Sequence, residues 1–343
     1  MFLLRLLIIT FVIALFSTAS VYYLYTKLLE QNLTIPHESL VIEIKKGETL
    51  NSVLNNLKEQ GVLESLWATK IYARINRFGN RIKAGEFKLT PPMTAPQLLQ
   101  FISSNNQIAY SIQFIEGSTY KDALLVLAKH EKILHTLDGL SDSDIAKKLN
   151  LEHLTHLEGQ LYPDTYHFHK GDSDVDILLR SNQRLTSILD EEWQARQKDL
   201  PLESAYQALI LASIIEKETG VPEERPEIAG VFIRRLQKKM RLQSDPTVIY
   251  GLGDSYQGNI TRKHLKQETP YNTYRISGLP PTPIALVGRA AIRAALNPKA
   301  GSSLYFVAKG DGSHYFSETI EEHNKAVRKY QLKRRSDYRS SAQ

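Results

Sequence analysis

The sequence predicts an α+β protein with one N-terminal transmembrane helix, a small β-α domain and a larger mixed α+β domain. Residues 6–25 form an uncharged apolar run, strand and capped-helix signals recur at 41–63 and 111–124, and residues 172–240 carry mainly helical patterns. Short strands beside long helices are typical of a mixed fold. A chain of 343 residues with 42% hydrophobic content is long and apolar enough for one large or two moderate domains.

The composition excludes several classes of function. The chain has no cysteine, which rules out thiol catalysis, disulfides and cysteine-rich zinc sites. A net charge of +6 suits an acidic polymer or an anionic lipid surface. No compact Lys/Arg block with interleaved aromatics precedes the C-terminal tail, so nucleic acid is not an expected partner. The histidines show no metal-binding spacing, and we therefore expect neither a metal nor a cofactor.

The apolar run at 6–25, LLIITFVIALFSTASVYYLY, predicts a transmembrane helix. About 20 residues with a rise of ~1.5 Å each span the hydrocarbon core of a bilayer. Arg5 precedes the run, and three tyrosines crowd its end, where their rings favour the interface. We therefore expect a single-pass protein of the inner membrane, with residues 1–5 in the cytoplasm and the bulk of the chain in the periplasm. A cleaved signal peptide, with small residues at 17–20, is the alternative.

A short polar stalk is expected at 26–38, followed by a small domain at 39–109. The run VIEI at 41–44 predicts a strand, and Thr49 is placed to cap a helix that ends at Gly61. This order of strand, Gly-x-Thr-Leu and helix resembles the lysin motif (LysM), a small module that binds amino-sugar polymers. Any β-α start of a domain would show the same pattern, so both interpretations stay open.

Residues 110–335 form the predicted larger domain, and residues 336–343 a basic tail. The domain opens with a strand, a glycine turn and a capped helix at 111–124, which echo the pattern at 41–54. A loop with a short strand is expected at 157–171. The remaining predictions are helices at 89–102, 126–150, 175–195, 203–219, 223–240, 286–296 and 318–335, a loop and short strand at 242–253, and a hairpin about Gly-Asp-Gly at 303–317.

The segment LILASIIEKETG at 209–220 places two carboxylates at the end of an apolar helix. The residues that share the face of Glu218 are bulky and aliphatic, namely Leu211, Ile214 and Ile215. Such neighbours remove water from a carboxyl and raise its pKa, and the last helical turn also disfavours negative charge. Glu218 is therefore the candidate general acid, and Glu216 a neighbour that tunes it or bonds to backbone. Alternatively, both glutamates face solvent beside Lys217 or Arg225.

Five segments in the second half of the chain carry a resemblance to a known family. They are ASIIEKETG (212–220), RLQSDPTVIYGLG (241–253), YNTY (271–274), GLPPTPI (278–284) and HYFS with EHN (314–324). Together with IKAGEFKL (82–89) and EGQLYPDTYHF (158–168), they resemble the endolytic murein transglycosylases, membrane-anchored enzymes with a LysM-like part and a catalytic domain. The resemblance covers nearly the whole chain after the anchor and is loosest at its LysM-like end.

The resemblance implies a reaction on peptidoglycan glycan strands. It implies cleavage of the β-1,4 bond between N-acetylmuramic acid and N-acetylglucosamine within the strand, which leaves a 1,6-anhydro-muramyl end and would stop the elongation of nascent strands. It also assigns the family's catalytic glutamate to Glu218. An anchored enzyme stays close to the site of glycan synthesis, so peptidoglycan synthases are candidate partners.

Polar residues near the acid are candidates for binding the sugars. They are Glu158, Glu216, Gln243, Ser244, Asp245, Thr247, Tyr271, Asn272, Thr273 and Tyr274. Aspartate before proline commonly caps a turn, so Asp245 is expected to shape the cleft. A hydrolase needs a second carboxylate, and an acid opposite Glu218 would favour a lysozyme-type hydrolase. The other alternative is a glycan-binding scaffold of the cell-wall machinery without catalytic activity.

Overall fold

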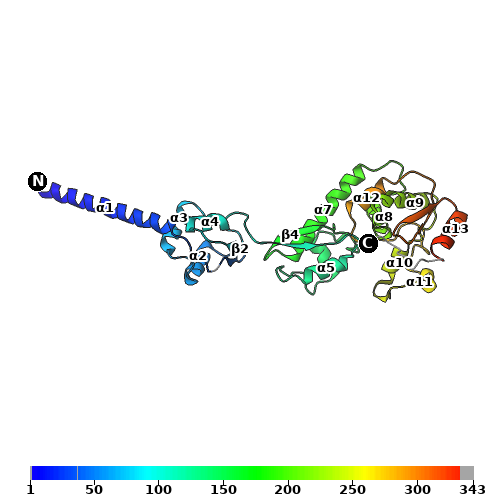
Figure 1. Cartoon of the computed structure of the whole chain (residues 1–343), viewed down its shortest axis with the longest axis horizontal. Coiled ribbons are helices and arrows are strands. Elements are labelled where there is room, and N and C mark those ends of the chain that lie inside the picture. The colour runs from blue at the N-terminus through cyan, green and yellow to red at the C-terminus, as the bar shows by residue number, and fades with distance from the viewer. Residues whose placement is uncertain (1, 37, 333–343) are drawn as a thin grey trace. The chain divides into compact units, whose positions relative to one another are not determined.

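The computed structural model of the chain describes residues 2–36 and 38–332. It contains helices and short strands in irregular order, so the predicted mixed α+β class is confirmed. The chain divides into two compact units, which Figure 1 shows with their elements labelled. The first unit holds residues 1–110 with the short segments 132–134 and 167–172, and the second unit holds the rest.

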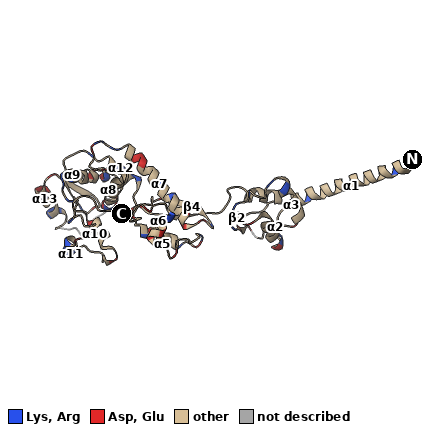
Figure 2. Cartoon of the chain, turned by 180° about the vertical axis from the view of Figure 1, so that it is seen from behind, with Lys and Arg blue, Asp and Glu red and all other residues tan. Residues whose placement is uncertain are grey.

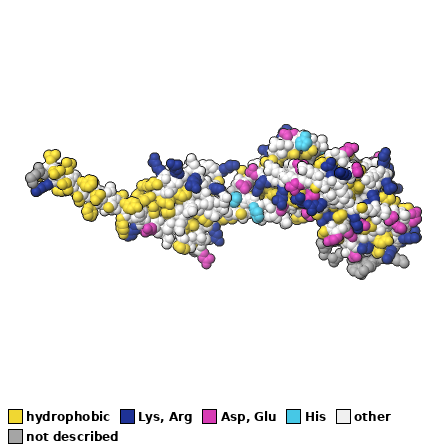
Figure 3. Space-filling model, turned by 90° about the horizontal axis from the view of Figure 1, so that it is seen from above, with side chains coloured by type: hydrophobic (Ala, Val, Ile, Leu, Met, Phe, Trp, Pro, Cys, Tyr) yellow, Lys and Arg dark blue, Asp and Glu magenta, His cyan; other side chains and the backbone are white. Residues whose placement is uncertain are grey.

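The first unit opens with one long apolar helix, α1 (Phe2–Glu30). Its length and its mean hydropathy of 2.3 over the most apolar window are sufficient to cross a membrane, and none of that window is buried in protein. A signal sequence near the N-terminus would have the same properties. Charged side chains on α1 lie only near its two ends (Figure 2), and apolar side chains cover the helix between them (Figure 3).

The stretch expected as a polar stalk, 26–38, is not a free linker. The helix α1 continues to Glu30, and both Leu29 and Leu33 are buried. The backbone amide of Leu33 also donates a hydrogen bond to the carbonyl of Met93 (2.7 Å). Because Leu33 joins the core that follows, the end of α1 is connected directly to that core without a free linker.

The rest of the first unit has one core between a small sheet and three helices. The antiparallel sheet pairs β1 (Leu40–Ile44) with β2 (Gly85–Leu89). The helices are α2 (Leu50–Glu59), α3 (Leu66–Ile75) and α4 (Ala95–Ile102). Their buried leucines and the fully buried Phe87 form the core. The predicted cap at Thr49 is confirmed, since its side chain accepts a hydrogen bond from the amide of Ser52 (3.2 Å). At the start of α4, the backbone amide of Thr94 donates to the side chain of Gln97 (2.8 Å) as part of a capping box.

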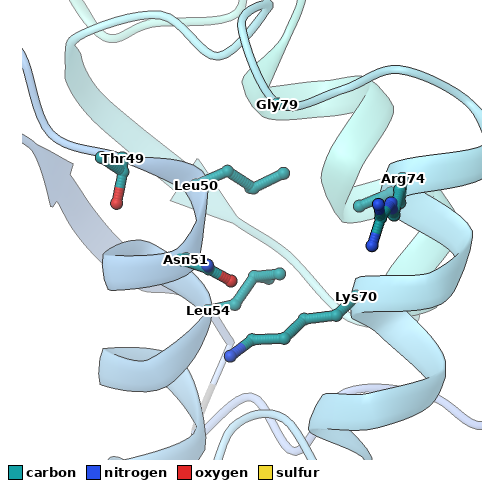
Figure 4. A pocket seen from close by; sticks show the side chains of 8 residues that line it. Thr49, Leu50, Asn51, Leu54, Lys70, Arg74 and Gly79 are labelled. Carbon is teal, nitrogen blue, oxygen red and sulfur yellow. The ribbon is translucent and has the colours of Figure 1, made fainter.

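A cavity of about 520 Å³ lies between α2 and α3. Figure 4 shows Lys70 and Arg74 of α3 on one side of it and Leu50, Asn51 and Leu54 of α2 on the other. The Lys70 ammonium reaches across to α2 and donates to the side-chain carbonyl of Asn55 (3.1 Å). The cavity wall is therefore apolar at its base and basic at its α3 rim.

The second unit is built mainly from helices, with the hairpin of β5 (Tyr305–Ala308) and β6 (His314–Ser317) and parts of β3 (Ala109–Gln113) and β4 (Thr165–His169), whose residues are divided between the two units. The strands β3 and β4 pair with each other, and the predicted hairpin is confirmed as β5 against β6. The helices are α5 (Tyr120–Ala128), α6 (Asp142–Lys148), α7 (Asp174–Gln194), α8 (Ala205–Glu218), α9 (Arg225–Gln237), α10 (Asp245–Leu252), α11 (Arg262–Lys266), α12 (Arg289–Leu296) and α13 (Ile320–Tyr330).

Helix α8 is the central element of the second unit. Residues 208–215 are all buried, because α7, α9 and α12 pack around the helix. A helix that is apolar on every side needs this kind of enclosure. Its buried Ser213 accepts a hydrogen bond from the backbone amide of Ile284 (3.0 Å), which ties the segment before α12 to α8. The C-terminal end of α8 is thereby held in a fixed position.

The segment 126–150, expected to be helical throughout, is interrupted. Helix α5 ends at Ala128, and α6 begins only at Asp142, after its predicted cap Ser141. The loop between them is stabilised from a distance, because the buried carboxylate of Asp174 accepts hydrogen bonds from the backbone amide of Thr136 (2.9 Å) and from that of the next residue. Local periodicity gives no sign of this partner.

Two further C-terminal predictions differ in part from the structure. The segment 242–253, expected as a loop and short strand, contains helix α10, whose first turn carries Pro246. Proline is favoured there because its missing N–H would have no partner in the first turn. The final predicted helix, 318–335, is α13, which ends at Tyr330. Residues 333–335 of the predicted helix and the predicted basic tail at 336–343 lie outside the described residues.

The buried carboxylate of Glu192 ties α7 to α12. Its side chain is 3% exposed, and it accepts hydrogen bonds from Nε of Arg289 (2.6 Å) and from Nη2 of Arg293 (2.8 Å). These two guanidinium groups hold the pKa of Glu192 below its usual value, and the hydrogen bond from Arg293 has the largest effect. A depressed pKa means that the carboxylate stabilises the folded state above the unfolded-state pKa and loses this contribution as the pH falls.

We expect Glu192→Gln to lower the free energy of unfolding by about 1–3 kcal/mol at pH 7. The difference from the parent should shrink below about pH 4, where the parent carboxylate also takes up a proton. The measurement is the free energy of unfolding in urea, followed by the fluorescence of Trp193. A Trp67→Phe background leaves Trp193, the neighbour of Glu192 in the sequence, as the single fluorescent probe. The matched control is Glu191→Gln, whose 57% exposed side chain also binds Arg289 and should contribute less than about 1 kcal/mol. Equal losses in both variants would contradict this account.

Candidate active site

Helix α8 ends in a carboxyl group that is enclosed by protein but not sealed from solvent. Glu218 is the last helical residue, and the chain leaves the helix at Thr219 in an extended conformation. The Glu218 side chain is only partly exposed. Its carboxylate accepts a hydrogen bond from the hydroxyl of Ser244. The position therefore combines strong loss of hydration at the carboxyl with partial exposure of the residue as a whole.

Burial raises the pKa of Glu218 to about 7. The hydrogen bond from Ser244 opposes this rise because it stabilises the charged form, and the negative charge of Asp245 adds to it. The positive charge of Arg235 acts in the same direction as Ser244. The raised pKa that the sequence predicts is therefore confirmed, with desolvation as its largest cause.

A network of buried hydroxyl groups holds Ser244 in place. The backbone amide of Ser244 donates to Oγ1 of Thr273 (2.9 Å), and Oγ1 of Thr247 donates to the carbonyl of Ser244 (2.7 Å). The two threonine hydroxyls also share a hydrogen bond of 2.8 Å. All three residues are at most 2% exposed. The segments 243–247 and 271–274, far apart in sequence, thus form one rigid support for the Ser244 hydroxyl.

Three of the predicted sugar-binding residues have no surface with which to touch a sugar. Thr247, Asn272 and Thr273 are between 0% and 1% exposed. The Asn272 amide donates to the carbonyl of Gln267 (2.6 Å) and accepts from the backbone amide of Tyr274 (3.0 Å). Their polar atoms are bonded within the protein, so direct sugar contact is corrected to a role in fixing the loops.

The exposed candidates lie beside the acid. Tyr274 donates a hydrogen bond from its hydroxyl to the carboxylate of Asp245 (2.7 Å), and burial is the main cause that raises the pKa of Tyr274. Gln243 is exposed and has a φ of 54°, an uncommon conformation for a residue other than glycine. The backbone amide of Gln243 donates to the backbone carbonyl of Thr273 (3.2 Å). Gln243, Asp245 and Tyr274 therefore offer polar groups near Glu218.

Arg235 is a member of the site that the sequence pattern does not single out. Arg235 is 6% exposed and donates from Nε to the carbonyl of Leu304 (2.6 Å) and from Nη1 to that of Leu242 (2.9 Å). Its guanidinium also lies 5.0 Å from the ring centre of Tyr305. The available signal is its spacing of three residues from the buried Phe232, which places it on the core face of α9.

The other two predicted glutamates belong to separate clusters. Glu216 has a side chain that is 5% exposed, accepts from Nη2 of Arg225 (3.1 Å), and accepts from the backbone amide of Gly288 (3.0 Å). The predicted bond to backbone is thus confirmed. Glu158 accepts from the backbone amide of Tyr120 (2.9 Å) and from the hydroxyl of Tyr250 (3.2 Å). Burial raises the pKa of both carboxyls, and both lock chain segments together.

Tyr271 connects the Glu158 cluster to the loop before α12. Its ring packs edge-on against Tyr250, with 4.9 Å between ring centres, and its hydroxyl shares a hydrogen bond with Thr282 (2.9 Å). Tyr250 lies in α10, the same helix that begins with Asp245.

Within residues 2–36 and 38–332, no group of three or more His, Asp or Glu side chains is arranged to hold a metal ion. The chemistry that the arrangement itself supports is proton transfer at Glu218.

Comparison with known proteins identifies the family of this chain. A model of the YceG-like family matches residues 42–329. The endolytic murein transglycosylase of Bacillus subtilis is 32% identical over 305 residues, with 84% of each chain covered. That of Streptococcus pneumoniae is 25% identical, and the match covers 90% of this chain and 62% of the longer streptococcal protein. A crystal structure of a YceG-like protein from Listeria monocytogenes, 31% identical, covers 84% of this chain and 98% of its own with a TM-score of 0.53. The chain therefore belongs to the YceG-like family.

Proposed function

We propose that this chain is a peptidoglycan lytic transglycosylase that cleaves within glycan strands, with Glu218 as its general acid. The observation that carries the proposal is the placement of the Glu218 carboxyl at the end of a buried helix, bonded to the Ser244 hydroxyl, where burial raises its pKa to about 7. A general acid works best when its pKa lies near the operating pH. The proposal is supported by the name of the Bacillus relative, an endolytic murein transglycosylase.

The proposed reaction needs one carboxyl and no water. Protonated Glu218 gives its proton to the oxygen that bridges N-acetylmuramic acid and N-acetylglucosamine while the bond to the anomeric carbon breaks. The resulting carboxylate then takes the proton of the C6 hydroxyl of the muramic acid residue, whose oxygen attacks the anomeric carbon. This step closes the 1,6-anhydro ring and returns the proton to Glu218. The Ser244 hydroxyl and the Arg235 charge stabilise the carboxylate between the two transfers.

A lysozyme-type hydrolase is the alternative reaction at the same site. Hydrolases of that type use a second carboxylate as nucleophile or as the base that activates water. Asp245 is the candidate for this second carboxylate, since its charge raises the pKa of Glu218. However, its carboxylate accepts a hydrogen bond from the Tyr274 hydroxyl. We therefore assign Asp245 the role of keeping the proton on Glu218. A scaffold without catalytic activity would have no use for a desolvated acid in this position.

The proposal also covers the place of action. We propose that residues 6–25 of α1 form a single-pass anchor in the cytoplasmic membrane, that residues 39–109 form a LysM-like domain, and that residues 110–335 form the catalytic domain. The active site would then act in the periplasm on glycan strands close to the membrane. That location makes peptidoglycan synthases the proposed partners.

Glu218→Gln should lower the rate of glycan cleavage by about 10²–10⁴-fold, because the amide cannot give a proton to the leaving oxygen. The assay is digestion of purified peptidoglycan sacculi by the full chain in detergent. The matched control is Glu223→Gln, an exposed glutamate five positions further along the chain, which should cleave like the parent. Cleavage by Glu218→Gln at the parent rate would refute the assignment of the acid.

The glycan fragments released should each be lighter by one water than fragments of the same length from a muramidase, because the C6 hydroxyl replaces water as the attacking group. Mass spectrometry of the released glycans measures this difference directly. Treatment of the same sacculi with a lysozyme provides the hydrated reference. Products that carry only reducing ends would reject the transglycosylase reaction and favour the hydrolase.

Activity should decline as the pH rises above about 7, where Glu218 loses its proton. Ser244→Ala removes a hydrogen bond that favours the carboxylate, so the decline should move to higher pH. Asp245→Asn removes a repelling charge, so the decline should move to lower pH. The measurement is kcat/KM against pH for the parent and both variants. Three coincident profiles would show that the titrating group is not Glu218.

A further inference from the structure

An apolar face runs along α3 in the first unit. Trp67, Ile71 and Ile75 follow each other at intervals of four residues and therefore share one side of the helix. Their exposed fractions are 44%, 43% and 69%. Single exposed apolar residues are common, but a row of three large ones marks a surface that meets something apolar. We call these three residues the α3 face.

The α3 face is continuous with the apolar helix α1. A groove of about 480 Å³ runs between the two helices. It is lined by Ser17, Thr18, Val21, Tyr22, Tyr25, Trp67, Ile71 and Ile75. The Trp67 ring lies 6.2 Å from that of Tyr25, and Figure 3 shows apolar side chains that continue from α1 onto the first unit. Whatever surrounds α1 at this level therefore also meets α3.

The position of the groove along α1 gives its depth in a membrane. Residues 17–25 cover roughly 12 Å of helix axis at ~1.5 Å per residue. They form the last part of the apolar run 6–25, which matches a hydrocarbon core of about 30 Å. If that run spans the bilayer, the groove falls within the outer leaflet. The buried Leu29 and Leu33 leave no free linker that would let α3 move away from this level.

The charges around the α3 face match a phospholipid surface. Residues 65–85 contain no Asp or Glu and five basic residues, Lys70, Arg74, Arg77, Arg81 and Lys83. An apolar helix face flanked by Lys and Arg is the arrangement that binds at the boundary of headgroups and acyl chains. Basic groups near an anionic leaflet are attracted to its headgroups. Tryptophan beside tyrosine at the end of a span is likewise typical of this boundary.

We propose that α3 is a membrane-contacting helix, with the α3 face in the outer-leaflet boundary and anionic phospholipid headgroups over the basic residues beside it. The inference rests on the proposed membrane anchor and is independent of the chemistry at Glu218. It makes the first unit part of the membrane attachment. The unit is then held against the bilayer in one orientation, so α1 does not act as a simple tether.

Fluorescence quenching tests the proposal, because the chain has two tryptophans. Trp193→Phe leaves Trp67 as the single probe. The full chain is reconstituted into vesicles of phosphatidylcholine and phosphatidylglycerol, with or without bromine on the upper part of the acyl chains. We expect brominated lipid to quench Trp67 strongly. The double variant Ile71→Asp with Ile75→Asp should lose most of the quenching, whereas Val41→Asp, a 51% exposed apolar residue of β1 outside the groove, should keep it.

Flotation of the same vesicles distinguishes the membrane anchor at α1 from the proposed contact of α3 with lipid. Unquenched Trp67 in protein that floats would overturn the contact of α3 with lipid and leave the anchor intact; a second copy of the chain seated on the α3 face would give this result. Protein that fails to float would overturn both the anchor and the inference. Equal quenching in the double aspartate variant would assign the lipid contact to α1 alone and contradict the role of α3. Glycan cleavage, measured in parallel, reports on Glu218 independently.

Discussion

Removal of water from the Glu218 carboxyl is the physical constraint on which the candidate site depends. An isolated carboxyl ionises near pH 4.3, whereas burial at the end of α8 raises the pKa of Glu218 to about 7. The enclosure follows from the core, since α8 is surrounded by α7, α9 and α12. The same hydrophobic packing that stabilises the second unit therefore also sets the protonation of its acid.

The neighbours of Glu218 adjust this protonation in opposite directions. The Ser244 hydroxyl and the Arg235 guanidinium favour the carboxylate, and the charge of Asp245 favours the protonated form. Their positions are fixed by residues that never reach the surface, such as Thr247 and Thr273. A proton donor that must also take a proton back benefits from this balance, because neither state is strongly trapped.

The sequence pattern predicts a structural feature correctly where the contacts that determine it are close in sequence. It fails where those contacts join residues that are distant in sequence. The face of Glu218 and its raised pKa follow from helical spacing within α8. The hydrogen bond from Ser244 joins residues that are 26 apart, and the loop before α6 depends on Asp174 some 38 positions away. The segment 242–253 is predicted as a loop and short strand, since its valine, isoleucine and tyrosine favour strands, whereas its proline is compatible with the first turn of α10.

The most direct test of the central claim is a titration of Glu218 itself. Carbon-13 NMR of glutamate-labelled protein follows each side-chain carboxyl against pH, and Glu218→Gln identifies the signal by its loss. The account predicts a midpoint near pH 7 for this carboxyl. A midpoint close to 4.3, the value of a hydrated glutamate, would contradict it.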